Sequence, residues 1–371
     1  MKEQSKSDQE VEERLIEFDD RVIAHPILDS VSKSLRAAVQ RPAGSTIIAN
    51  VGPTGAGKTT LIKRLYRDRL SVSAALMKAD PGHIPVILVE AVCPDNGIFH
   101  WGDFYVRFLE AALEPMVEKK SLDLSNREIR ERRKKAGTFA ELRRAVEHCI
   151  RHRGTRVVII DEAQHLTKVP NARRLQDQLD TIKSLASLSG VLFVMVGTYE
   201  LLTLLNQNGQ LARRTRRIHF PRYNLNRPRE RQAFRNILGM FESRLPLLGE
   251  GVLVPRLEYM YQGSLGCIGM LKDWLRRALS HAFEAGRRSL VFDDLEATVL
   301  EHDSLLEILQ EIREGEARIA LAAGQCEELR MQLGLGQSND SHSAKVPASQ
   351  TVPKRAVGER RPVRDPVGGA A

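Results

Sequence analysis

Cysteine is scarce in this sequence, and long apolar runs and a targeting segment are absent. Four cysteines occur among 371 residues, and none has the CxxC spacing of a metal or redox pair, so we expect neither a disulfide framework nor an oxidising compartment. No apolar run exceeds seven residues, well short of the roughly 20 that span a membrane. The first twenty residues lack the apolar core of a signal peptide. We therefore expect a soluble cytoplasmic protein without a membrane partner.

Acidic residues are in the minority, and the excess of positive charge is unevenly distributed. Asp and Glu number 47 against 56 Lys and Arg, which gives a formal net charge of +9. The first twenty residues hold eight acidic and three basic residues, whereas 126–156 holds four acidic and eleven basic ones. Residues 207–235 hold one acidic and nine basic residues, and 336–371 holds three and six. Clustered positive charge indicates an acidic partner such as nucleic acid.

Aliphatic and β-branched runs alternate with segments of helical periodicity as far as Pro221. This alternation predicts an α/β fold, a parallel sheet sandwiched by helices. We expect strands at 46–51, 84–92, 156–160, 191–196 and 217–220, and helices at 27–39, 61–70, 99–116, 139–152, 171–188 and 199–206.

After Pro221 no strong strand pattern recurs, and short helices are expected instead. Asn226 is the expected N-cap of the first of them, with Pro228 in its first turn. The tail has no aromatic residues and many Ser, Pro, Gly and Arg, which is typical of disorder. The expected parts are a charged arm at 1–25, an α/β core at 26–222, a helical lid at 223–302, an amphipathic helix at 303–335 and a disordered basic tail at 336–371.

A glycine-rich loop between the first strand and the next helix matches the pattern GxxxxGK[ST]. Small residues let successive backbone N–H groups face phosphate oxygens, Lys58 would reach the β- and γ-phosphates, and the Thr59 hydroxyl would bind Mg²⁺. A chance match at an ordinary strand–helix turn is the alternative. The expected nucleotide-binding residues are Gly52, Pro53, Thr54, Gly55, Ala56, Gly57, Lys58, Thr59 and Thr60.

The strand expected at 156–160 runs directly into two carboxylates. Asp161 at its end would hold Mg²⁺ through water, and Glu162 would polarise the attacking water. In phosphoryl transfer the protein contributes mainly positioning and charge stabilisation, so these residues nearly suffice for hydrolysis. The alternative is a solvated acidic strand end.

Two further features follow the strand at 191–196. Thr198 would sense the γ-phosphate or the attacking water, or it would simply cap the next helix. Arg213 and Arg214 are candidates for an arginine finger that enters a neighbouring subunit's site and stabilises transition-state charge. A basic surface or a DNA-facing run is the alternative for this arginine pair.

Together these residues resemble an AAA+ ATPase, a P-loop sheet followed by a small all-helical lid. More narrowly they resemble the TniB/TnsC-type regulators of DNA transposition. The narrower features are His25-Pro26, DEAQHL at 161–166, VGTYELL at 196–202 and LARRTRRIHFPRY at 211–223. The resemblance implies ATP and Mg²⁺ as cofactors, ATP hydrolysis, and a ring or filament of identical subunits on duplex DNA. It also implies a link between a target-selection protein and a transposase.

One position departs from the pattern of this family. Many AAA+ lids carry an Arg at the start of a helix that contacts the γ-phosphate, and residues 263–272 contain none. Either Lys272 substitutes for it or the contact is absent. A second hypothesis for the whole chain is a secretion- or signalling-type NTPase switch that acts on a protein partner. The basic runs would then be ordinary surface, and the 303–333 helix would bind the partner.

The basic run before Gly137 is the expected DNA contact. Insertions at this place in AAA+ assemblies can face the central channel and touch phosphates. Few aromatic residues lie among these charges, which favours backbone contacts to a duplex over base stacking on single strands. A solvated helix face is the alternative. The candidate contacts are Arg132, Arg133, Lys134 and Lys135.

Overall fold

The computed structural model describes residues 13–93, 97–117, 136–169, 172–206, 214–245, 251–324 and 326–333. The chain divides into two units, residues 1–319 and residues 320–371. The first unit holds the sheet, its covering helices and a separate group of helices. Among the described residues, no helix is both long enough and apolar enough to cross a membrane.

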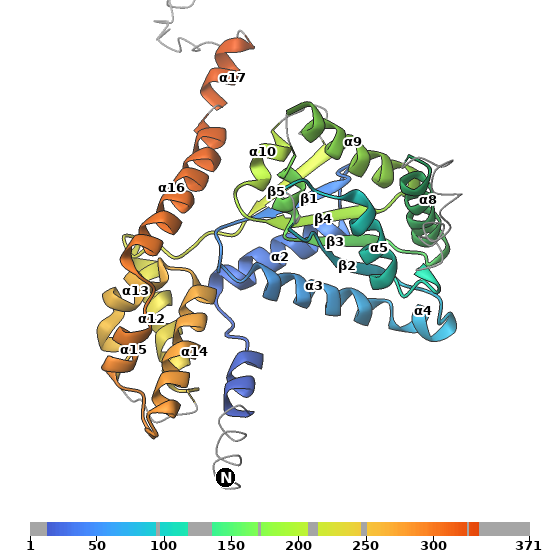
Figure 1. Cartoon of the computed structure of the whole chain (residues 1–371). Helices are drawn as coiled ribbons and strands as arrows, with labels where there is room; N and C mark the ends of the chain where they lie inside the picture. Colours follow the sequence, from blue (N-terminus) through green and yellow to red (C-terminus); the bar gives the residue numbers. More distant parts are fainter. Residues whose placement is uncertain are drawn as a thin grey trace, which may run out of the picture. The chain divides into compact units, whose positions relative to one another are not determined.

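A five-stranded parallel sheet forms the centre of the first unit (Figure 1). The strand order is β2-β3-β4-β1-β5, and every neighbouring pair is parallel. Helices connect successive strands, as parallel pairing requires. The strands are β1 (Ile47–Val51), β2 (Val86–Glu90), β3 (Val157–Asp161), β4 (Leu192–Gly197) and β5 (Thr215–His219).

The expected fold class is confirmed. The first four strands lie where the apolar runs predicted them, and the fifth is shifted. We expected that strand at 217–220, whereas β5 begins two residues earlier, at Thr215. Among the described strands it pairs with β1 alone, and Arg216 and Arg217 are exposed. Charged residues are tolerated on an edge strand because one side of it faces water. A search for apolar runs therefore places this strand too late.

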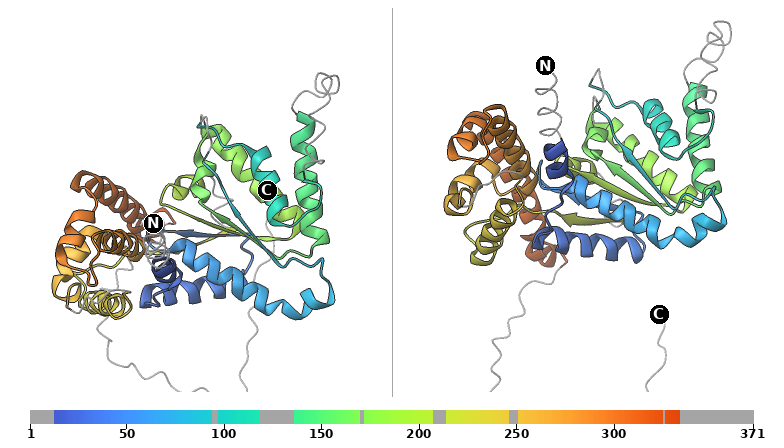
Figure 2. Two further views of the ribbon diagram at one scale, coloured as in Figure 1. Left: turned by 60° about the horizontal axis from the view of Figure 1, so that its bottom comes forward. Right: turned by 90° about the horizontal axis from the view of Figure 1, so that it is seen from below.

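Alternate residues of β1 pack into two hydrophobic cores on opposite faces of the sheet. Ile48 packs with α2 (Pro26–Gln40) and α3 (Lys58–Val72), while Ile47 and Ala49 face the other side. Figure 2 shows α2 and α3 on one face and the remaining core helices on the other. That second layer contains α5 (Trp101–Ala111), α8 (Ala136–His152), α9 (Ala172–Ser189) and α10 (Leu201–Leu205). The short helix α4 (Ala74–Ala79) follows α3, and the 3-10 helix η2 (Ala163–Thr167) follows β3.

Beyond β5 the described elements of the first unit are all helical, and they have a core of their own around Trp274. Leu15, Phe18 and Ile23 pack into this core, so part of the segment expected to be a charged arm is buried. The first of these helices is capped by Arg227 and not by Asn226, whose backbone N–H instead donates to the Asn224 side chain. The elements are α12 (Pro228–Glu242), η3 (Val254–Arg256), α13 (Leu257–Ser264), α14 (Ile268–Glu284) and α15 (Phe292–Thr298).

Two helical segments follow, α16 (His302–Gly324) and α17 (Cys326–Gln332), in the stretch where the sequence predicts one amphipathic helix; residue 325 between them lies outside the described residues. Leu305 and Ile312 of α16 pack against Leu265, Cys267 and Met270. In the second unit, α17 exposes Leu329 and Met331. The expected disordered tail, 336–371, lies outside the described residues.

Candidate functional site

The glycine-rich loop connects the end of β1 to the start of α3. Gly55 and Gly57 have positive φ angles of 70° and 102°, a region that side chains disfavour. A Cβ on Gly52 would lie 2.4 Å from the backbone oxygen of Phe220. The loop therefore needs glycine at these positions, twice for its conformation and once for a close approach to the residue after β5.

Lys58 is the first residue of α3, and its side chain folds back over the loop. Its Nζ donates hydrogen bonds to the backbone oxygens of Gly52 (3.1 Å) and Pro53 (2.7 Å). Burial lowers the pKa of Lys58, and the nearby Glu162 and Asp161 carboxylates oppose this shift. No carboxylate of the described residues contacts this buried amine, so it is well placed to bind the negative charge of a phosphate.

Asp161 and Thr59 meet across the loop. The Thr59 hydroxyl donates to Asp161 Oδ2 at 3.2 Å, and the Glu162 backbone N–H donates to Asp161 Oδ1 at 2.9 Å. Burial raises the pKa of Asp161, while these hydrogen bonds lower it. A hydroxyl and a carboxylate oxygen are hard donors of the kind that Mg²⁺ binds beside phosphates, so the residues present fit this ion.

Glu162 lies one residue beyond β3 in a left-handed backbone conformation, with φ at 51°. The buried Gln164 side chain connects it to the neighbouring strand. Gln164 Nε2 donates to Glu162 Oε2, and Gln164 Oε1 accepts from the Thr198 backbone N–H at 3.1 Å. Because β3 and β4 are adjacent and parallel, Asp161, Glu162 and Thr198 come together at one edge of the sheet.

A small hollow opens on the other side of the loop, and sequence reasoning did not predict it. It lies among Ile23 and His25 before α2, Gly57 and Thr60 at the start of α3, and Ile268 in the first turn of α14. Its lining mixes apolar side chains with the cationic Arg21 and Lys272, and apolar surface with a few polar groups beside a phosphate loop suits a planar base. Of the motifs noted in the sequence, His25-Pro26 lies at this hollow, and His25 also caps α2 through its Nδ1 atom.

The first turn of α14 contacts the loop directly. The backbone N–H groups of Gly269 and Met270 both donate to the Gly55 oxygen, at 2.6 and 3.2 Å. Lys272, the candidate substitute for the missing lid arginine, donates from Nζ to the backbone oxygens of Asp19 and Arg21. Its role toward a nucleotide stays a prediction.

The candidate finger and DNA residues are placed only in part. Arg213 and the run Arg132, Arg133, Lys134 and Lys135 lie outside the described residues. Arg214 is exposed, and its backbone oxygen accepts from the N–H of Thr46, just before β1. The glycine-rich loop follows the opposite end of β1, about 16 Å away at 3.3 Å per residue. Arg214 is thus separated from its own loop by the length of a strand.

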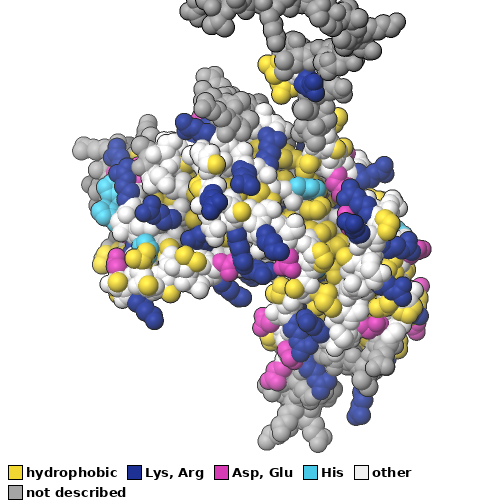
Figure 3. All heavy atoms as spheres, turned by 180° about the vertical axis from the view of Figure 1, so that it is seen from behind, with side chains coloured by type: hydrophobic (Ala, Val, Ile, Leu, Met, Phe, Trp, Pro, Cys, Tyr) yellow, Lys and Arg dark blue, Asp and Glu magenta, His cyan; other side chains and the backbone are white. Residues whose placement is uncertain are grey.

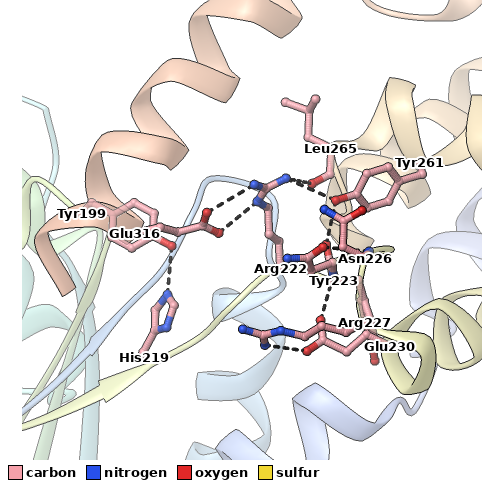
Figure 4. Close-up of polar contacts among 11 residues, drawn as sticks. Tyr199, His219, Arg222, Tyr223, Asn226, Arg227, Glu230, Tyr261, Leu265 and Glu316 are labelled. Atoms are coloured by element: carbon pink, nitrogen blue, oxygen red, sulfur yellow. Dashed lines mark hydrogen bonds and ion pairs between the residues drawn. The ribbon is translucent and has the colours of Figure 1, made fainter. Parts of the chain in front are cut away.

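A polar cluster joins α16 to the core and to the end of α13 (Figure 4). Arg222 pairs with Glu316 through two hydrogen bonds, Nε to Oε1 at 2.9 Å and Nη2 to Oε2 at 3.2 Å, and it also donates to the Leu265 backbone oxygen. Tyr199, next to Thr198, shares a hydrogen bond of 2.9 Å with His219. A Cβ on Gly315 of α16 would lie 2.1 Å from the Tyr199 ring, so the helix backbone rests on that ring.

Residues 41–205 match the model of a protein family described as "AAA domain". The matched segment contains the glycine-rich loop, Asp161, Glu162 and Thr198. With the parallel sheet order above, the fold is that of a P-loop AAA+ protein, followed by helices. None of the curated proteins matches the sequence.

Several solved structures are similar at low sequence identity. The ORC2 protein of Aeropyrum pernix in its ADP form has 19% identity and a TM-score of 0.49, over 76% of this chain and 70% of that one. A Walker-type ATPase of Pyrococcus abyssi has 16% identity and a TM-score of 0.45, over 82% and 76%. ORC of Drosophila bound to DNA has 14% identity and a TM-score of 0.43, over 88% and 84%.

Proposed function

We propose that this protein is a Mg²⁺-dependent ATP hydrolase of the AAA+ type. The observation that supports it best is the convergence of Lys58, the Thr59–Asp161 pair and Glu162 at one edge of the sheet. A loop that binds phosphate without hydrolysing it would need only Lys58 among these residues. Hydrolysis needs the metal-side oxygens and a carboxylate beside the attacking water as well.

Each residue has a role that its position supports. Lys58 exchanges its two backbone acceptors for phosphate oxygens, and the loop N–H groups bind the same phosphates. Thr59 and Asp161 would hold Mg²⁺, which neutralises charge on the phosphates when bound. Glu162 orients the attacking water, and the hollow at Ile23 and Ile268 holds the base.

Two substitutions separate binding from hydrolysis. Lys58→Ala should weaken binding of a fluorescent ATP analogue by about 100-fold or more, because a charge-assisted contact is lost from a buried site. Glu162→Gln should keep binding within a few-fold and reduce the rate of phosphate release by about 100-fold or more. Lys63→Ala, on the exposed face of the same helix, is the control. Hydrolysis that survives in Glu162→Gln would contradict this assignment.

We further propose that the protein forms an ATP-dependent oligomer on duplex DNA and regulates transposition, linking a target-selection protein to a transposase. The sequence resemblance and the clustered positive charge support this proposal. Lys and Arg side chains also spread over the face of the molecule seen in Figure 3. Arg214 lies a strand's length from its own loop, which suits a finger that acts on a neighbouring subunit, and Arg213 beside it is the second candidate.

Salt dependence tests the DNA contact. With a non-hydrolysable ATP analogue, binding of random-sequence duplex should fall steeply as salt rises, and replacing Arg132, Arg133, Lys134 and Lys135 by alanine should reduce the log–log slope by up to about 3.6. Absence of duplex binding at 50 mM salt would refute the DNA part. An intact slope in the variant would mean that other basic residues make the phosphate contacts, and absence of duplex binding would favour the switch that acts on a protein partner. The transposition role is tested by adding purified transposase and target selector and measuring strand transfer with and without ATP.

A further inference from the structure

We propose that Gln164 is a positioning residue for hydrolysis, which fixes the Glu162 carboxylate by tying it to the backbone of the adjacent strand end. This inference rests on the proposed ATP hydrolysis and deepens it. Gln164 does not touch the phosphate loop through any hydrogen bond of the described residues, so its action is through Glu162.

The orientation of the Gln164 amide follows from its partners. The Thr198 backbone N–H can only donate, so it must meet the carbonyl end, Oε1. The amino end, Nε2, then faces the Glu162 carboxylate, which accepts from it. Both ends of the amide are used, and the residue is only 6% exposed. The Glu162 carboxylate is thereby attached to a fixed backbone group one strand away.

The surrounding chain is built to hold Gln164 in this place. The Thr167 hydroxyl donates to the Gln164 backbone oxygen at 2.7 Å, which ties the end of η2 back to Gln164. On the other side, a Cβ on Gly197 would lie 2.5 Å from Gln164 Oε1 and 3.1 Å from its backbone nitrogen. The last residue of β4 therefore has to be glycine for the amide to reach Thr198. This accounts for Gly197 without any contact to nucleotide.

The position of Glu162 explains why its carboxylate needs the hydrogen bond from the Gln164 amide. A glutamate one residue beyond a strand has three side-chain torsions and partial exposure, so its carboxylate would otherwise sample several positions. Catalysis by a general base needs one position within hydrogen-bond reach of the water. Restricting the carboxylate raises the turnover rate and leaves nucleotide affinity unchanged, because Lys58, Thr59 and the loop amides do the binding.

Gln164→Met removes both hydrogen bonds at nearly constant volume. We expect kcat for ATP to fall by about 10- to 100-fold, the range for a lost hydrogen bond to a charged group, with KM and ATP-analogue affinity within about twofold of wild type. Lys168→Met, at the exposed end of η2, is the matched control and should keep wild-type kcat. Gly197→Ala leaves Gln164 in the chain but displaces its amide, and it should reproduce the loss of kcat.

A double-mutant comparison separates positioning from general destabilisation. If Gln164 acts through Glu162, then adding Gln164→Met to Glu162→Gln should lower single-turnover rates by no more than about twofold. A further 10-fold loss in that background would overturn the inference, as would Gln164→Met and Gly197→Ala enzymes with wild-type kcat. Wild-type protein that hydrolyses no ATP would instead refute the proposed function itself. Should Gln164→Met not fold, the folded Gly197→Ala protein decides the question by the same criteria.

Discussion

His25 is a buried histidine whose protonation the fold opposes, and this makes stability depend on pH. Its Nδ1 atom accepts a hydrogen bond from the Leu28 backbone N–H at 3.3 Å and shares one of 3.0 Å with the Tyr223 hydroxyl. A proton on Nδ1 would remove the acceptor of the Leu28 N–H and place a positive charge at the start of α2, where the helix dipole is unfavourable. Burial lowers the pKa of His25 to about 4, although Asp29 raises it slightly.

The sign and size of the effect follow from linkage. Between pH 6.5 and pH 4 the unfolded chain binds a proton at this position and the folded chain does not, so stability falls as the pH falls through this window. At 1.36 kcal/mol per pKa unit, lowering the pH from 7 to 5 should reduce the free energy of unfolding by about 2 kcal/mol through His25 alone. The contribution is fully present above pH 6.5.

Urea unfolding of wild type and His25→Asn at pH 7 and pH 5 measures this contribution. Asparagine keeps a side-chain oxygen that can cap α2 but does not titrate. The loss of stability between the two pH values should therefore be about 2 kcal/mol smaller in the variant, with the other titrating groups common to both proteins. Equal losses in the two proteins would refute the assignment of a lowered pKa to His25.

The attachment of α16 gives two further predictions. Gly315→Ala would place a methyl group 2.1 Å from the Tyr199 ring and should destabilise the protein by about 1–3 kcal/mol through overpacking. The control is Gly239→Ala in α12, where the nearest atom would be 3.8 Å away, and it should stabilise the protein by about 0.5–1 kcal/mol. Equal melting temperatures of the two variants would contradict the close approach at Gly315. Glu316→Gln removes one charge of a pair with Arg222 that water reaches only in part, and it should lower the free energy of unfolding by about 1 kcal/mol at low salt and by less at high salt. Urea unfolding at two salt concentrations checks this, and a difference that salt does not change would count against the ion pair.

The phosphate loop and the two carboxylates at the end of β3 are predictable from sequence because their geometry is local. The distance from Gly52 to Thr59 is set by the chain itself, and a run of four β-branched residues marks the strand that ends at Asp161. The sheet could be predicted for the same reason, since parallel strands buried on both faces are recognisable as apolar runs. β5 was misplaced because an edge strand does not need that pattern.

Long-range contacts were not predictable in this way. Gln164 stands in the motif at 161–166, yet its importance depends on the Thr198 N–H, 34 residues away. Phe18 and Ile23 are buried in the helical core around Trp274. Lys272 donates to the backbone oxygens of Asp19 and Arg21, and these bonds join segments some 250 residues apart. No spacing rule encodes such pairs, because they arise only when separate elements pack together.

The contact between α14 and the Gly55 oxygen has a mechanical consequence. The first amides of a helix have no partner within it, and α14 has no side-chain cap, so the loop oxygen serves as its cap. An outward rotation of α14 would break both hydrogen bonds to the Gly55 oxygen at once, leaving two N–H groups and one carbonyl without these partners. The orientation of α14 therefore depends on hydrogen bonds to the backbone of the loop that it contacts. A Cβ on Gly269 would lie 2.5 Å from the Gly55 oxygen. A side chain there would therefore deform the loop, although Gly269 belongs to α14 and not to the sheet or its covering helices.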